Sequence, residues 1–434
     1  MQKKLIALAV ASVASGAAFA QTNVTLYGIA DAGYIYSSSD PGRYQIVPGT
    51  EYPANSIVKI PGENKFSGIT SGLLSGSRIG FRGEEALGNG LKAIFTLEYS
   101  INIDDNSGVG NTTTGLNARQ QFVGLSHAKI GTLTLGRQYA PGYLATVNND
   151  PFGGALFEPQ SYLSAQAGNT ITPNSGARWN NAISYTSPNW AGFTAKAIYS
   201  FGETNNATAF TGTGVNTRVI PAGTYNDKVV DVSDNGRWGL GFNYANGPLN
   251  IDLVLQQRQN VVPNPETLYG GNVLNPALAP RAAAGDDINE GYIGASYDFK
   301  VVKIMGSYQQ QNDKNPLNND NKLWQLGAVV PVGNGNIHLG YAQLEMDMGK
   351  NKAPYGPLAM VTGAGLVTTV KKLNGDSNAW ALGYTHNLSK RTTLYAGYVW
   401  NDNDKDGLAA GPVQAVAAKG EDSNTFLAGI RHSF

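Results

Sequence analysis

The chain has 434 residues, with 31 basic and 31 acidic side chains, 54 glycines, 22 tyrosines and no cysteine. The balanced charge excludes a general electrostatic attraction to nucleic acid, and the lack of cysteine excludes stabilisation by disulfides. No stretch after residue 20 is apolar and long enough for a transmembrane helix, which excludes a helical membrane bundle.

The first twenty residues have the pattern of an export signal. Lys3 and Lys4 precede a short apolar core, and Ala18-Phe19-Ala20 forms a small-residue cleavage site. The core is shorter than the ~20 apolar residues that a membrane-spanning helix needs, which favours cleavage over anchoring. We therefore expect two parts, a cleaved signal peptide (1–20) and a single β-barrel domain (21–434). Without Lys3 and Lys4, 29 basic side chains face 31 acidic ones, a net charge of −2.

Period-two alternation of apolar and other residues, typical of β-strands, recurs from residue 23 to the end of the chain. Leu91, Ala93, Phe95 and Leu97, for example, share one face of a strand. The pattern predicts sixteen strands, at 23–36, 77–84, 91–99, 118–127, 132–138, 178–187, 193–202, 237–245, 249–259, 288–298, 301–311, 322–331, 336–345, 378–388, 392–400 and 426–434. The last run ends on Phe434 and leaves no residues for a crossover helix, so we expect it to pair with the first strand.

Short turns and long polar connections alternate between these strands. Asn89-Gly90 and Asn246-Gly247 are typical of tight hairpins, whereas 37–76, 104–117, 140–176, 203–235, 260–286, 346–376 and 401–420 are long and rich in Gly, Asn and Pro. This distribution is typical of an antiparallel transmembrane β-barrel with short periplasmic turns and long external loops. A soluble β-sandwich also has many short strands, but it has less reason for strictly alternating connection lengths.

Tyrosines and tryptophans recur near the predicted strand ends. These positions suit the two aromatic girdles that flank the apolar band of an outer-membrane barrel. The candidates are Tyr27, Tyr34, Tyr36, Trp190, Tyr199, Tyr244, Tyr341, Tyr384, Tyr398 and Trp400. Phe434 would be the girdle residue of the closing strand.

Several segments together resemble Gram-negative general diffusion porins, and most closely the trimeric porins of β-proteobacteria. They are Leu26-Tyr27-Gly28, the hairpin from Ser77 to Phe95 (SRIGFRGEEALGNGLKAIF), 119–125 (RQQFVGL), 131–138 (GTLTLGRQ), 178–181 (RWNN) and 428–434 (AGIRHSF). Each segment is only moderately specific, but their order and spacing over the whole mature chain are highly specific.

The resemblance implies an outer-membrane homotrimer of water-filled barrels, each narrowed by a third long loop that folds inward. It implies passive diffusion of small hydrophilic solutes and ions, contact with outer-membrane lipid and lipopolysaccharide, and recognition of Phe434 as an assembly signal by the barrel-assembly machinery. No cofactor is implied.

Alternation places charged side chains inside the barrel. With Ile79 and Phe81 toward lipid, Arg78 and Arg82 face the lumen. By the same argument Lys92, Glu98 and Arg178 also face inward. We expect Arg78, Glu98 and Arg178 at the constriction, with Arg82 and Lys92 as further lumen residues.

Arg119 and Arg137 have the parity of neighbouring lipid-facing residues, so alternation alone does not place them inside. An irregular strand exit would turn Arg137 inward, and the family resemblance assigns both residues to a basic cluster at the constriction. Loop 140–176 has two acidic residues, Asp150 and Glu158, which we expect opposite the arginines. Charged rings of this kind set ionic preference. Simple bracing of the wall by ion pairs is the alternative, and both roles are compatible.

Other chemistry is weakly indicated. The four histidines, at 127, 338, 386 and 432, lack the spacing of zinc ligands, and Ser126-His127 is not a catalytic arrangement by adjacency alone. We therefore expect no enzyme and no metal site. The function hypotheses are a weakly anion-selective diffusion channel, a substrate-selective channel and, least favoured, a barrel enzyme.

Overall fold

The computed structural model describes residues 23–39, 45–47, 56–58, 64–105, 117–202, 236–261, 286–315, 318–348, 359–361, 367–369, 373–404 and 422–434. The expected signal peptide (1–20) lies outside the described residues, as do large parts of the expected external loops.

Seventeen strand segments form one sheet: β1 (Asn23–Ser39), β4 (Asn64–Ser71), β5 (Arg78–Gly88), β6 (Leu91–Ser100), β7 (Ala118–His127), β8 (Gly131–Tyr139), β9 (Arg178–Thr186), β10 (Phe193–Ser200), β11 (Arg237–Asn246), β12 (Leu249–Val261), β13 (Asp286–Asp298), β14 (Lys303–Asp313), β15 (Asn319–Val332), β16 (Gly335–Met348), β19 (Leu373–Asn387), β20 (Thr392–Asn403) and β21 (Ser423–Ser433). Two small hairpins stand apart from it, β2 (Gln45–Val47) with β3 (Ser56–Val58) and β17 (Ala359–Val361) with β18 (Val367–Thr369).

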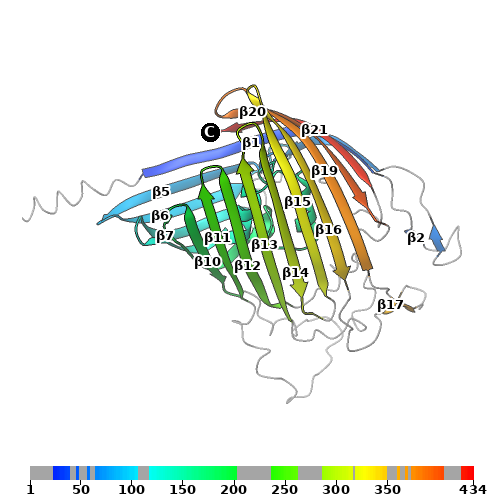
Figure 1. Cartoon of the computed structure of the whole chain (residues 1–434), viewed down its shortest axis with the longest axis horizontal. Coiled ribbons are helices and arrows are strands. Elements are labelled where there is room, and N and C mark those ends of the chain that lie inside the picture. Colours follow the sequence, from blue (N-terminus) through cyan, green and yellow to red (C-terminus); the bar gives the residue numbers. More distant parts are fainter. Residues whose placement is uncertain are drawn as a thin grey trace, which may run out of the picture.

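The sheet is closed by antiparallel pairing of β1 with β21. Eleven registered pairs run from Ile29↔Ser433 to Ser39↔Ser423, and the other edge of β1 pairs with β4 and β5. β4 and β5 are two halves of the second strand, so the barrel has sixteen strands, as the sequence predicts. In Figure 1 the C-terminus lies at the rim where hairpins such as β15–β16 turn tightly.

The second strand begins earlier than expected. We expected a loop up to residue 76, but β4 already pairs with the distal half of β1. The strand breaks only between β4 and β5, where Gly72 has φ +74. There the Asp31 carboxylate accepts hydrogen bonds from the backbone amides of Leu74 and Ser75 and from the Tyr395 hydroxyl. A buried inner-wall carboxylate therefore replaces the lost strand hydrogen bonds.

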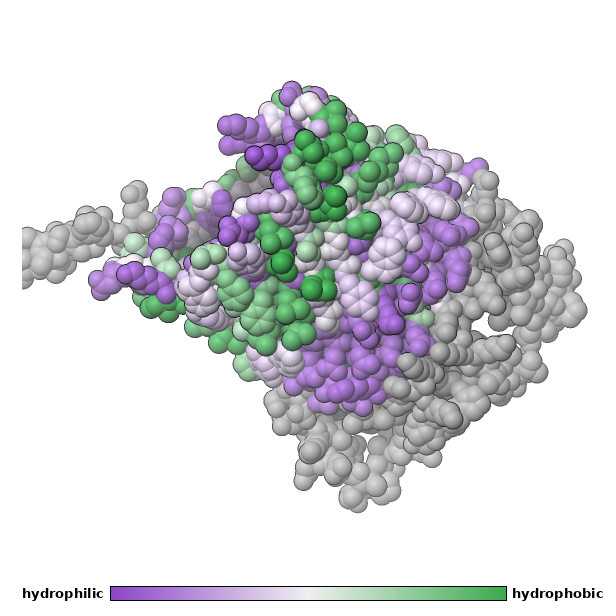
Figure 2. Space-filling model, viewed as in Figure 1, coloured by the Kyte–Doolittle hydropathy of each residue, from purple (hydrophilic) through white to green (hydrophobic). Residues whose placement is uncertain are grey.

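The two faces of the strands differ in polarity. On β12, Ile251, Leu253 and Leu255 are exposed on the outside, whereas Asp252 and Gln256 are buried within the barrel. Figure 2 shows the result as an apolar band with hydrophilic surface gathered toward the ends of the strands. Tyr27 departs from the expected girdle, because its hydroxyl donates to Glu98 on the inner face.

The segment after β8 folds into the barrel, as expected for the third long loop. It contains α2 (Pro141–Asn148), α3 (Pro159–Gln166) and the 3-10 helix η1 (Ser175–Ala177). The N-terminus of α3 is stabilised by its cap residue, because the Glu158 side chain accepts a hydrogen bond of 2.9 Å from the backbone amide of Ser161. Proline in the first turn also favours the helix start. α2 packs against β8 and β10–β13, and α3 against β15, β16 and β19.

The main apolar core lies between this inward loop and the wall from β15 round to β1. Phe152, Phe157 and Leu163 of the loop pack against residues such as Leu344 and Leu427 of the strands. None of the described helices is long and apolar enough to cross a bilayer.

Candidate functional site

Strand register creates the first part of the site. Tyr27 on β1, Gly80 on β5 and Glu98 on β6 form one row across the inner face. A Cβ at Gly80 would lie 2.5 Å from Cζ of Tyr27, so the missing side chain lets the tyrosine pass over β5. Its hydroxyl then donates to Oε2 of Glu98 at 3.1 Å. Gly80 is therefore needed for this cross-strand contact.

Two arginines share the other oxygen of Glu98. Arg119 Nε lies 2.7 Å and Arg78 Nη1 4.0 Å from Oε1. The register of β6 and β7 shifts between the pairs Glu98↔Gln120 and Tyr99↔Ala118, which leaves Arg119 as the extra residue. This bulge explains why strict alternation does not place Arg119 inside.

Arg178 joins the same group through two tyrosines. The rings of Tyr139 and Tyr143 stack with centroids 3.6 Å apart, and the Arg178 guanidinium lies 5.1 Å from the Tyr139 centroid. The Tyr139 hydroxyl accepts hydrogen bonds from Arg119 Nη2 and Arg178 Nη2, each at 3.5 Å. Tyr143 belongs to α2, and burial raises the pKa of its phenol to about 12. We call Arg78, Arg119 and Arg178 the arginine cluster.

Arg137 lies beside this cluster. Its Nε donates to the carbonyl of Ala118 at 3.1 Å, and its Nη1 donates to the carbonyl of Arg178 at 3.3 Å and to Asn180. The register of β8 and β9 shifts between the pairs Gly136↔Ala182 and Gln138↔Trp179, but the extra residue lies on β9, so this shift is not the irregular exit of β8 that we expected. These contacts join the strands that carry Arg119 and Arg178.

The other expected lumen cations lie nearer the short turn of β5 and β6. The Arg82 guanidinium is 5.2 Å from the ring centroid of Tyr27, on the inner face. Lys92 Nζ pairs with Glu84 at 2.8 Å, and both side chains are about half exposed. The structure therefore brings Arg82 close to the cluster through Tyr27 and leaves Lys92 nearer the turn.

Asp150 and Glu158, which we expected opposite the arginines, are buried within the inward loop and accept hydrogen bonds from its backbone amides. Asp150 is 5 % exposed, and its two oxygens accept the backbone amides of Phe152 and Gly154 at 2.7 and 2.8 Å. Glu158 is fully buried as the cap of α3. The loop folds around both carboxyl groups because they accept hydrogen bonds from its backbone amides. Strand alternation does not predict such contacts, because it applies only to residues in strands.

The two carboxyl groups also contact one another. Burial raises the pKa of Asp150 to about 7. Burial and the neighbouring Asp150 carboxyl raise the pKa of Glu158 well above its ordinary value. Both shifts favour the protonated forms, so the pair contributes less negative charge than its formal −2.

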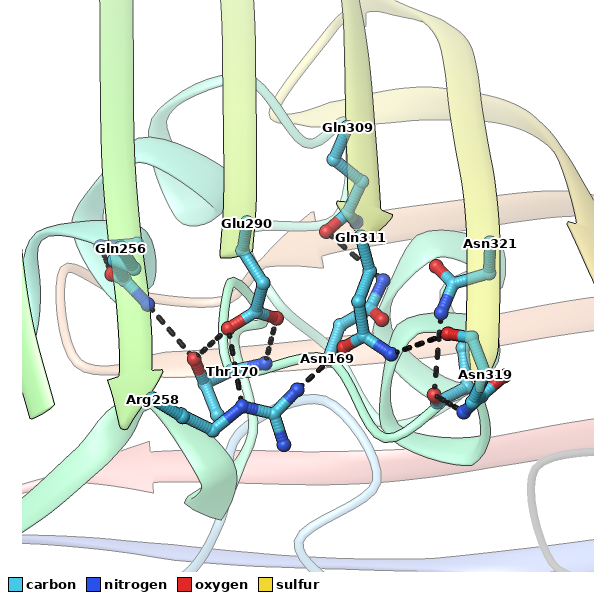
Figure 3. A network of polar contacts seen from close by, with 11 residues as sticks. Asn169, Thr170, Gln256, Arg258, Glu290, Gln309, Gln311, Asn319 and Asn321 are labelled. Carbon is cyan, nitrogen blue, oxygen red and sulfur yellow. Dashed lines mark hydrogen bonds and ion pairs between the residues drawn. The ribbon is translucent and has the colours of Figure 1, made fainter. Parts of the chain in front are cut away.

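Polar groups of the wall hold the inward loop. The Asp252 carboxylate accepts from Asn149 at 2.8 Å and from Asn243 at 2.9 Å. Further along, Glu290 accepts the backbone amide of Thr170 at 2.5 Å and also its hydroxyl, and it pairs with Arg258 at 3.6 Å. Figure 3 shows that this network joins the loop to four consecutive strands, β12 to β15.

Several of these residues were missed by the sequence reasoning, namely Tyr27, Gly80, Asp31, Asp252 and Glu290. Alternation contains a signal for Tyr27, which follows the outward Leu26, and for Asp252, which lies between the outward Ile251 and Leu253. What alternation does not reveal is their partners. Within the described ranges, no group of three or more His, Asp or Glu side chains is arranged to hold a metal ion.

Comparison with known proteins agrees with this architecture. Residues 7–406 match the model of the Gram-negative porin family. The chain is 33 % identical to outer membrane porin protein 32 of Delftia acidovorans, with all of both chains aligned. It is 31 % identical to an outer membrane porin of Bordetella pertussis, over 91 % of this chain and 93 % of that one.

Among solved structures, an anion-selective porin from Comamonas acidovorans superimposes with a TM-score of 0.65 at 28 % identity, covering 95 % of this chain and all of that one. OmpF of Salmonella typhi, at 14 % identity and a TM-score of 0.54, shares the fold. The chain therefore belongs to the Gram-negative porin family, and it is a diffusion channel of the outer membrane rather than an enzyme.

Proposed function

We propose that the channel is weakly to moderately selective for anions and that the arginine cluster is its constriction. The observation that carries this proposal is the local charge. Among the described residues three guanidinium groups are balanced by one carboxylate, Glu98, whereas Asp150 and Glu158 are buried in the loop with their carboxyl oxygens on its backbone amides. Fixed positive charge beside a narrow aqueous path favours anions.

Distant charges contribute less than the cluster. Solvent-exposed charges are screened beyond about 8–10 Å in physiological salt, so the net charge of the chain does not set the preference at the constriction. The structural similarity to an anion-selective porin at 28 % identity supports the same sign of selectivity. Arg137 serves in this proposal as the brace between strands β7 and β9.

The proposal extends to processing and assembly. Residues 1–20 are removed on export, and the mature chain forms a homotrimer in contact with lipopolysaccharide. The barrel-assembly machinery recognises Phe434 as an assembly signal. The basic, apolar and small-residue pattern of the first twenty residues and the aromatic end of β21 support these statements.

Reversal potential in a potassium chloride gradient tests the selectivity. We expect the wild-type channel to prefer chloride, and we expect the variant Arg78→Gln/Arg178→Gln to shift toward potassium. The control Lys390→Gln/Arg391→Gln removes two positive charges from the short β19–β20 turn and should leave the potential nearly unchanged. A cation-selective wild type, or a double variant with an unchanged potential, would contradict the proposal.

A further inference from the structure

A pocket of about 290 Å³ lies on the barrel wall between the arginine cluster and the short turn of β5 and β6. Its lining includes one guanidinium, one carboxylate, two hydroxyl groups and the apolar side chains of Ile94 and Phe122. The polar groups belong to Arg82, Glu84, Thr25 and Thr96, and Asn23, Gly83 and Phe95 complete the lining. We call this hollow the vestibule pocket.

The register shows that the pocket opens to the lumen. Thr25, Arg82, Thr96 and Phe122 are partners in one row across β1, β5, β6 and β7. Arg82 lies over Tyr27, which is on the inner face, so the row faces inward. Four residues separate Arg82 from Arg78 along β5, or roughly 13 Å at about 3.3 Å per residue. The pocket is therefore a second possible binding position along the lumen, on the periplasmic side of the arginine cluster.

The charge of the pocket favours an anion. Glu84 is already paired with Lys92 at 2.8 Å. Among the described residues Arg82 has no carboxylate partner, and its guanidinium group lies over the Tyr27 ring. Its guanidinium group is free to form the paired, charge-assisted hydrogen bonds that arginine makes with a carboxylate. The ion pair at the rim leaves Arg82 as the unbalanced charge.

The apolar side chains that line the pocket favour an anion that also carries an apolar group. Ile94 and Phe122 are only partly buried, although the inner face of a porin is generally polar. A hydrated inorganic anion would leave both side chains in contact with water, and a neutral sugar would leave Arg82 without a partner. A volume of 290 Å³ lies at the lower end for small-molecule sites, so the ligand is small.

We propose that the vestibule pocket binds small monocarboxylates with a flat apolar body, with the carboxylate on Arg82 and the body against Ile94 and Phe122. This inference rests on the proposed function because it assumes a channel that admits anions. Such a solute meets the arginine cluster and the vestibule pocket in succession. The pocket gives the channel a preference among organic anions that the cluster alone does not provide.

Block of chloride current by benzoate, added on the periplasmic side of a planar bilayer, tests the proposal with acetate as the comparison. We expect benzoate to block at lower concentration than acetate. Arg82→Gln should raise the half-blocking concentration of benzoate about three- to tenfold. Ile94→Val should raise it about threefold and leave acetate unchanged, since one buried methyl group is lost.

Arg391→Gln is the matched control, because it removes the same charge from the short β19–β20 turn, outside the lining of the pocket. It should leave benzoate block within about twofold of wild type, because exposed charges are screened beyond about 8–10 Å in physiological salt. Equal block by benzoate and acetate, or equal effects of Arg82→Gln and Arg391→Gln, would overturn the proposal. In crystals soaked with 4-bromobenzoate, an anomalous bromine peak beside Ile94 and Phe122 would support it even if Arg82→Gln fails to assemble, and no peak there would contradict it.

The reversal potential separates this inference from the proposed function. A cation-selective wild type would contradict the anion channel itself. A chloride-selective channel whose benzoate block is insensitive to both pocket variants would contradict only the vestibule pocket.

Discussion

The ring of Phe434 covers Gly28 on the outer face of the barrel. The two residues exchange backbone hydrogen bonds of 3.1 Å in both directions. A Cβ at Gly28 would lie only 2.3 Å from Cζ of Phe434. The last residue of the chain is thus packed into the first strand, and the glycine makes the close approach possible.

Deleting Phe434 should lower the yield of heat-modifiable trimer in the outer membrane at native expression, because the barrel loses its closing aromatic residue. Gly28→Ala should also lower the yield, since overpacking at this contact costs about 1–3 kcal/mol. The double variant Gly28→Ala/Phe434→Ala should be no worse than Phe434→Ala alone. Additive losses in the double variant, or normal assembly without Phe434, would show that this contact does not matter.

Replacing Glu98 by Gln should increase anion selectivity, because it removes the carboxylate that Arg78 and Arg119 share. Arg119 is 8 % exposed, so loss of its partner should also cost about 3 kcal/mol of stability. The reversal potential in potassium chloride and the temperature of trimer dissociation measure the two effects. Glu84→Gln removes an exposed carboxylate on the same wall and should change both much less.

Thr170→Val should loosen the inward loop. The substitution keeps the shape of the side chain but removes the hydroxyl that donates to Glu290 and accepts from Gln256 Nε2 at 2.9 Å. Leaving buried partners unpaired costs about 1–3 kcal/mol. We expect larger open-channel current noise in single-channel recordings. Thr170→Ser restores the hydroxyl and should return the noise to the wild-type level, and equal noise in both variants would argue against this role.

Stability of the inward loop should fall as pH rises. The folded-state pKa of Asp150 is raised to about 7 by burial, above the value of about 4 in an unfolded chain. The folded loop therefore binds more protons between these values, and its stability is highest below pH ~4 and lowest above pH ~7. Between pH 5 and 8 we expect a loss of about 3 kcal/mol.

Glu158→Gln should flatten this pH dependence. The amide can still accept from the Ser161 backbone, and its Nε2 can donate to Asp150 at every pH. Thermal unfolding followed by circular dichroism at pH 5 and pH 8 compares the variant with wild type. An unchanged difference between the two pH values in Glu158→Gln would mean that another group carries the titration.

Local residue patterns determined most of the architecture. A side-chain period of two and alternating connection lengths suffice to give sixteen strands and a polar interior, because each is a property of neighbouring residues. The inward third loop was expected only from the resemblance to porins. The same alternation gives Arg78 and Glu98 the inner face on which their side chains meet. Arg178 lies beyond a register shift between Ala182 and Trp179, so alternation from Ile183 and Tyr185 does not decide its face. Alternation failed at Arg119, where a bulge shifts the register by one residue and reverses the face.

Tertiary structure alone decided which side chains meet. Tyr27 reaches Glu98 only because Gly80 lies between them in the folded register, and Tyr143 stacks on Tyr139 only because α2 returns to the wall. Asp150 and Glu158 look like channel charges in the sequence, yet the loop buries them to satisfy its own amides. Strand alternation assigns a face to a residue, whereas contacts across strands and loops depend on register and on how a non-repetitive segment folds against the wall.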